Sequence, residues 1–116
     1  MLNTNLTHIT TPAQLETTLA ENENVMICCG RMGPMCIPVY DVMESLESKY
    51  PHVAFRDMAF DEPVATAVRG LPQVQSFRSL PFVLYFRGGQ LVVAKSGIQS
   101  KQDVKAVLDS ALSAAA

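Results

Sequence analysis

Short apolar runs alternate with amphipathic stretches along the chain, and this pattern predicts an α/β protein. The continuous apolar run from Val25 to Cys29 is typical of a strand buried on both faces. A second run from His52 to Phe60 predicts another inner strand. Between the two runs, Pro34 to Tyr50 carries apolar residues at helical spacing, with Pro38 inside the pattern. Because proline has no backbone N–H, we expect that helix to kink or to start late.

Capping signals predict three further helices. Thr11 with Gln14 three residues later has the form of a capping box, which predicts a helix up to about Ala20. Asp61 is expected to cap a short helix through about Arg69, and Ser100 to cap the last helix.

A hairpin is indicated near the end of the chain, where two apolar runs, Phe82–Phe86 and Leu91–Ala94, flank Arg87-Gly88-Gly89-Gln90. The predicted order is therefore an N-terminal helix followed by βαβαββα. The first two strands must pair in parallel and the last two antiparallel, which makes one mixed sheet with helices on both faces. No linker or repeat divides residues 1–116, so we expect a single domain.

Composition narrows the function classes. The chain has 116 residues, of which 48% are hydrophobic, and a net charge of -2, which argues against a nucleic-acid-binding surface. No apolar segment is long enough to cross a membrane and the N-terminus has no signal-peptide pattern, so the cytoplasm is the expected compartment. Three cysteines, an odd number, do not form a disulfide framework.

Two segments resemble the active site of the thioredoxin family. Gly33-Pro34-Met35-Cys36 is similar to its Cys-Gly-Pro-Cys motif, with Gly33 at the place of the first cysteine. The stretch Phe77–Gln90 is similar to the family's cis-proline strand and hairpin. The resemblance implies a thioredoxin fold, thiol–disulfide redox chemistry, and a cis Pro81 facing Cys36. It also implies that Met32 replaces the family's tryptophan and Ile27 its buried acid.

The candidate catalytic residues are Cys36 and Cys29. Cys36 takes the place of the family's second cysteine, and one thiol alone completes no dithiol cycle. Cys28 and Cys29 lie on opposite faces of their strand, where small core residues are the ordinary interpretation. The loop after Cys29 is expected to let Cys29 approach Cys36, with Arg31 stabilising a thiolate. The alternative for Cys36 is a part-buried helix cysteine without a redox role.

The candidate binding surface combines both segments, and its residues are Met32, Gly33, Pro34, Met35, Leu80 and Pro81. Partners would be proteins with thiols or disulfides, or glutathione; we expect no cofactor and no metal. The methionines and cysteines also form a set of soft ligands suited to Cu(I), with core packing as the alternative.

Two functions remain open at this point: an atypical, at most weak or monothiol, oxidoreductase, and a non-catalytic binding or chaperone-like module.

Overall fold

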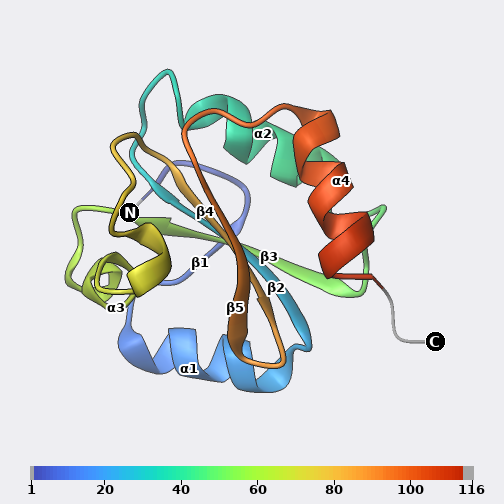
Figure 1. Cartoon of the computed structure of the whole chain (residues 1–116), viewed down its shortest axis with the longest axis horizontal. Coiled ribbons are helices and arrows are strands. Elements are labelled where there is room, and N and C mark those ends of the chain that lie inside the picture. The colour runs from blue at the N-terminus through green and yellow to red at the C-terminus, as the bar shows by residue number, and fades with distance from the viewer. Residues whose placement is uncertain (1, 114–116) are drawn as a thin grey trace.

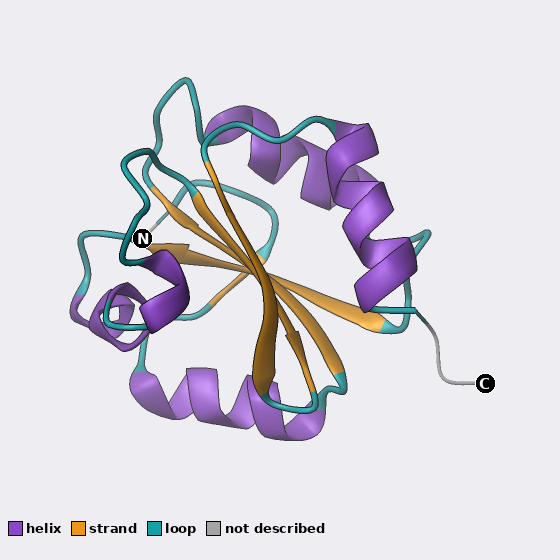
Figure 2. Ribbon diagram, viewed as in Figure 1, coloured by secondary structure: helices purple, strands orange, loops and turns teal. Residues whose placement is uncertain are grey.

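The computed structural model describes residues 2–113 and has a twisted sheet between two sets of helices (Figure 1, Figure 2). The strands are β1 (Thr7–His8), β2 (Asn24–Gly30), β3 (Val53–Ala59), β4 (Phe82–Arg87) and β5 (Gln90–Ser96). The α-helices are α1 (Pro12–Glu21), α2 (Ile37–Leu46), α3 (Thr66–Arg69) and α4 (Lys101–Ala111). Two 3-10 turns, Pro63–Ala65 and Pro72–Val74, flank α3. No helix within residues 2–113 is long and apolar enough to span a bilayer.

The sheet has the strand order β1-β3-β2-β4-β5. β2 pairs in parallel with β3 and antiparallel with β4, and β4 pairs antiparallel with β5, so the prediction of a mixed sheet is confirmed. Gly88 and Gly89 turn the hairpin with positive φ angles of 59° and 81°, which glycine adopts without a steric penalty. The strand β1 was not predicted from the pattern, because two residues carry no detectable alternation. It pairs in parallel with β3 at the edge of the sheet.

Two apolar layers lie on opposite faces of the sheet. In Figure 1, α2 and α4 cover one face and α1 and α3 cover the other. The first layer contains Met26, Cys28, Cys36 and Tyr40, while the second contains Ile27 and Cys29. Successive residues of β2 therefore alternate between layers, and the whole strand is buried. The loop between β2 and α2 therefore follows a strand whose two faces are both buried.

The helix starts test the capping predictions. Thr11 and Ser100 each form a complete capping box, as expected. Helix α2 begins late, at Ile37, with Pro38 in its first turn, which confirms the effect of the missing N–H. The prediction that Asp61 caps a helix is wrong, because Glu62 precedes the 3-10 turn and the Asp61 carboxylate binds Arg31 instead.

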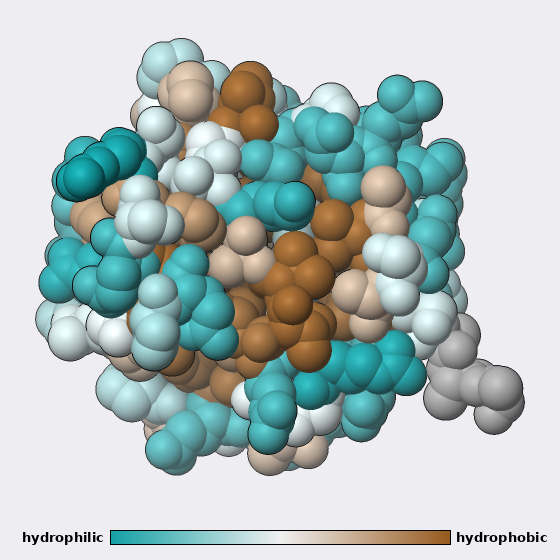
Figure 3. Space-filling view, viewed as in Figure 1, coloured by the Kyte–Doolittle hydropathy of each residue, from teal (hydrophilic) through white to brown (hydrophobic). Residues whose placement is uncertain are grey.

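Strand β5 forms one edge of the sheet. Figure 3 shows apolar side chains gathered over it, and Val92 on this strand is 49% exposed. Lys95 on the same strand is exposed, and a charge on an edge strand disfavours pairing with another chain. Val93 of the same strand packs against the α2 layer, so β5 is exposed only in part.

The α4 cap gives a direct test of the helix boundaries. We expect Ser100→Ala to lower the free energy of unfolding by about 1 kcal/mol, because the hydroxyl accepts the Asp103 N–H and its loss leaves that donor without its cap. Ser110→Ala is the matched control, since its exposed hydroxyl only donates to the Ala106 carbonyl within the helix. Urea unfolding measures both, and equal losses for the two variants would contradict the assigned cap.

Candidate functional site

Cys36 occupies the position just before the first residue of α2. Its backbone N–H and that of Ile37 both donate to the Gly33 carbonyl, so the turn from Gly33 to Ile37 is held by its own hydrogen bonds. The residue is only 3% exposed. The Arg31 N–H is directed at its Sγ over 3.4 Å. Pro38, at the second helical position, has no N–H to offer, and the Cys36 side chain makes no capping hydrogen bond to the helix.

Gly30 makes close packing around this sulfur possible. A Cβ placed on Gly30 would lie 2.8 Å from Cys36 Sγ, 2.9 Å from the Tyr40 hydroxyl and 3.1 Å from Pro81 Cβ. The loop, helix α2 and the residue before β4 therefore meet over one strand position that has no side chain. The Leu80–Pro81 peptide bond is cis. Tyr40 donates a hydrogen bond of 3.1 Å to the Arg31 carbonyl, which ties the helix to the loop.

The two adjacent cysteines of β2 point to different layers. Cys28 packs in the α2 layer with Cys36, whereas Cys29 packs in the opposite layer. The placement of the two residues in opposite layers contradicts the expected approach of Cys29 to Cys36, because the strand itself lies between them. The alternation was predicted correctly, but the face that receives α2 could not be read from two neighbouring cysteines.

Electrostatics agrees with this placement of the thiols. Burial raises the pKa of the Cys28 thiol well above its usual value. Among the ionisable groups around Cys28, Cys36 raises that pKa most, ahead of its chain neighbour Cys29 and of Asp57. The Tyr40 pKa is also raised, first by burial and then by Cys28 and Cys36. Cys28, Cys36 and the Tyr40 hydroxyl thus form one buried group.

Cys36 is one of the residues that line a groove of about 400 Å³, which we call the Cys36 groove. Its lining residues are Arg31, Gly33, Pro34, Met35, Cys36, Arg78, Ser79 and Leu80. The groove brings together most of the predicted binding residues from both segments. Met32 and Pro81, by contrast, do not line it. The Met32 side chain is 44% exposed and its Sδ accepts the Asn3 N–H, whereas Pro81 packs over Gly30.

The direct partner of the Arg31 side chain is a carboxylate, and the effect of this side chain on a thiolate stays a prediction; Asp61 raises the Arg31 pKa most, and Cys36 is also among the groups that raise it. Its guanidinium binds the Asp61 carboxylate through two hydrogen bonds of 2.7 and 2.8 Å and lies over the Phe60 ring. The hydrogen bonds from Arg31 hold the pKa of Asp61 below its usual value. Both side chains are exposed, so the pair orients the loop more than it stabilises the fold.

A buried carboxylate that sequence analysis did not single out lies in the same layer. Asp57 on β3 is 1% exposed and is in register with Cys28 on one side and His8 on the other. Its Oδ1 lies 2.6 Å from His8 Nδ1, and the Thr4 hydroxyl donates to its Oδ2. His8, Asp57 and Cys28 therefore form a row across three strands. The partners of Asp57 are distant in sequence; His8, for example, is 49 residues away. A local sequence pattern therefore does not predict these contacts.

Ile27, aligned by resemblance with a buried acid, packs in the layer opposite Cys36. The acid that does lie on the Cys36 side of the sheet is thus Asp57 on the neighbouring strand.

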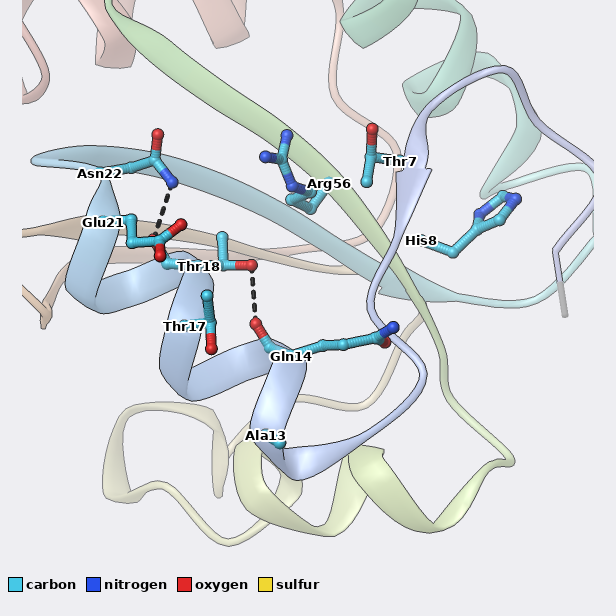
Figure 4. A pocket seen from close by; sticks show the side chains of 9 residues that line it. All are labelled: Thr7, His8, Ala13, Gln14, Thr17, Thr18, Glu21, Asn22 and Arg56. Atoms are coloured by element: carbon cyan, nitrogen blue, oxygen red, sulfur yellow. Dashed lines mark hydrogen bonds between the residues drawn. The ribbon is translucent and has the colours of Figure 1, made fainter.

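A second hollow, of about 360 Å³, lies between α1 and the β1–β3 edge. Figure 4 shows the threonines and Gln14 of this hollow, with the His8 ring directed away from α1. Its polar groups bind one another, as in the bonds from Thr18 to Gln14 and from Asn22 to Thr18. The hollow holds no thiol. Within residues 2–113, no cluster of three His, Cys, Asp or Glu side chains is placed to bind a metal ion.

Comparison with known proteins identifies the architecture. No protein-family model matches the chain, and no curated protein matches its sequence. Solved structures do match. Plasmodium falciparum thioredoxin has a TM-score of 0.74 at 18% identity, with 91% of this chain and 99% of that chain covered. Fasciola hepatica thioredoxin has a TM-score of 0.74 at 19% identity, covering 90% and 97%.

A plant structure extends the comparison. Oxidised thioredoxin O2 from Arabidopsis thaliana has a TM-score of 0.72 at 16% identity, covering 95% of this chain and 96% of its own. The chain therefore has the thioredoxin fold, as its sequence predicts. At these identities the likeness establishes the fold, and the function has to be argued from the site.

Two glycines of the site make a matched pair of tests. We expect Gly30→Ala to lower the free energy of unfolding by about 1 to 3 kcal/mol, because its methyl group would collide with Cys36, Tyr40 and Pro81. Gly33→Ala has no atom within 4 Å of the new methyl group and should change the free energy by less than about 0.5 kcal/mol. Urea unfolding measures both, and equal effects would contradict the packing over Gly30.

Alkaline pH tests the burial of Cys29. Burial raises the pKa of the Cys29 thiol from 9.0 to about 12, with Arg69 partly opposing the shift. Above pH 9.0 the unfolded chain loses this proton while the folded chain keeps it until about pH 12. The unfolded state then binds fewer protons, so the free energy of unfolding falls as pH rises, by up to about 1.4 kcal/mol per pH unit.

The measurement compares urea unfolding of the native protein and Cys29→Ala at about pH 8 and about pH 10.5. The variant should lose less stability over that interval, because one of the buried thiols that oppose ionisation is gone. Equal losses in the two proteins would show that Cys29 is not buried as described.

Proposed function

We propose that this chain exchanges its Cys36 thiol with disulfides of protein or peptide partners, or with glutathione, in thiol redox homeostasis. The observation that supports this most is that Cys36 lines the Cys36 groove, together with Ser79 and Leu80. A partner disulfide laid in the groove would present a sulfur atom to this thiol. The thioredoxin fold supports such chemistry by analogy with other proteins of the same fold.

The proposed step is an ordinary thiol–disulfide exchange. The Cys36 thiolate attacks one sulfur of the partner disulfide, a Cys36–partner disulfide forms, and the other sulfur leaves as a thiolate. The Arg31 N–H, 3.4 Å from Sγ, favours the anionic sulfur. Gly33 supplies no second thiol next to Cys36, so the exchange begins as the chemistry of one cysteine.

The walls of the groove indicate how a partner would be held. Met35 is 43% exposed and together with Pro34 and Leu80 supplies apolar contacts. Arg78 contributes a cation on the same lining. Such a groove suits an extended peptide segment, whose side chains pack against the apolar wall while its sulfur reaches Cys36.

A binding module without exchange is the second candidate, and a specific observation favours it. Cys36 is only 3% exposed, whereas Met35, Met32 and Ile98 are 43%, 44% and 53% exposed. Met35 Cε lies 3.8 Å from the Cβ position of Gly97, the neighbour of Ile98, so apolar surface continues from the loop to the end of β5. A partner that covers this surface would not need the thiol.

Substitution of Cys36 separates the candidates. We expect Cys36→Ser to lower the rate of mixed-disulfide formation with glutathione disulfide by at least about tenfold, because the remaining thiols are buried away from the groove. Cys29→Ser is the control, since it removes a thiol from the opposite layer and should leave the rate unchanged. Intact-mass measurement over time gives the rate for each protein.

Two results would go against the exchange proposal. Adducts that form equally fast in Cys36→Ser would place the reactive thiol elsewhere. A native protein that forms neither an adduct nor an internal disulfide, while peptides still bind it and perturb the NMR signals of Met35 and Ile98, would favour the binding module.

A further inference from the structure

We propose that Cys28 is the resolving thiol of this protein: it attacks the mixed disulfide on Cys36 and forms an internal Cys28–Cys36 disulfide. This inference rests on the exchange function proposed for Cys36. In this proposal, the second thiol of the exchange comes from the central strand β2 and not from the loop that carries Cys36.

The first support is the shared face of the strand. Cys28 and Gly30 are two residues apart on β2, so their side-chain positions point to the same face at a spacing of roughly 7 Å. Cys36 Sγ lies 2.8 Å from the Cβ position of Gly30. The Cys36 sulfur thus sits one strand position beyond Cys28, in the same buried layer.

The second support is the placement of the two neighbouring cysteines. Cys28 packs in the layer that contains Cys36 and Tyr40. Cys29 lies behind the strand, with Val64, Val68 and Phe82 in its layer. Of the two cysteines that follow each other in β2, only Cys28 therefore faces the sulfur that meets the partner.

The proposed bond requires the turn that carries Cys36 to shift along β2. Disulfide geometry needs Cβ atoms about 4 Å apart, so the bond draws this turn toward Cys28. The N–H groups of Cys36 and Ile37 both bind the Gly33 carbonyl, within the turn itself. Pro38 contributes no N–H to the first turn of α2, and nothing lies within 4 Å of the Gly33 Cβ position. Tyr40, whose hydroxyl lies over Gly30, is the side chain that has to yield.

The step balances in atoms and electrons. With glutathione as the partner, the Cys28 sulfur attacks Cys36 Sγ, the Cys36–glutathione bond breaks, and glutathione leaves as the thiol with the proton that Cys28 gives up. Glutathione disulfide is the oxidant, and it is reduced to two glutathione molecules while the protein gains one disulfide. Asp57, in register with Cys28 and 1% exposed, is the carboxylate beside the thiol that loses its proton.

The test uses the adjacent cysteines as a matched pair. The native protein, Cys28→Ala and Cys29→Ala are each treated with glutathione disulfide, desalted and followed by intact mass. In the native protein and in Cys29→Ala, we expect glutathione to be released and two hydrogens to be lost. In Cys28→Ala, the adduct on Cys36 should persist, with its release slowed by at least about tenfold. Release in the native protein should not depend on protein concentration, because the attacking thiol is in the same chain.

A measurement on the native protein alone guards against variants that fail to fold. The oxidised protein is digested without reductant, and fragmentation of the linked peptides identifies which of the two adjacent cysteines is joined to Cys36. A Cys28–Cys36 link supports the inference. A Cys29–Cys36 or Cys28–Cys29 link overturns it.

The failures of the two proposals are distinguishable. A stable glutathione adduct on Cys36 in the native protein, with no internal disulfide, would overturn the role of Cys28 and leave the exchange function standing. If Cys36 forms neither an adduct nor a disulfide, the exchange function itself is lost, and the role of Cys28 with it.

Discussion

The close packing over Gly30 is the constraint on which the rest of the site depends. Cys36 Sγ, the Tyr40 hydroxyl and Pro81 Cβ all lie within about 3 Å of the place where a side chain on Gly30 would begin. The central strand, the start of α2 and the segment before β4 are thereby brought together at one point. The Cys36 groove is the outer side of this contact, and the buried thiol group is its inner side.

In this arrangement, the surface that a partner contacts is different from the thiol that reacts with it. The groove exposes Met35 and Arg78 to a partner, while the thiol beneath them is almost completely buried. A partner therefore has to displace water and pack against the groove before its sulfur meets Cys36. On the inner side, Cys28, Asp57 and His8 lie next to one another on three neighbouring strands, so ionisable groups extend across the sheet. The layer under α2 is thus a core that also carries proton-binding groups, which is uncommon for buried strands.

Local signals were sufficient for most of the fold. The apolar runs located β2 and β3, the glycine pair located the hairpin, and Pro38 explained the late start of α2. The failures have physical causes. Asp61 binds Arg31, thirty residues away in sequence. A capping pattern depends on neighbouring residues only, so it does not predict such a long-range ion pair. Strand β1 has only two residues, so no alternation marks it.

The sequence predicts which segments form the site, but it does not predict which face of the sheet each side chain of β2 occupies. Both halves of the Cys36 groove were identified, because each is a contiguous motif. The expectation that Cys29 approaches Cys36 did not foresee that Cys29 packs in the opposite layer, since alternation shows that neighbours diverge without showing which neighbour faces the helix. Asp57 was missed because its contacts with His8 and Thr4 depend on the parallel register of three strands.

In the proposed function, partners meet this protein through the Cys36 thiol. Site-resolved alkylation of the folded protein is the measurement to make, with the modified cysteine identified by peptide fragmentation at successive times. We expect Cys36 to be modified first, and Cys28 and Cys29 to react only when the protein unfolds in urea. If Cys28 or Cys29 is modified as fast as Cys36 under native conditions, partners do not meet the protein through Cys36.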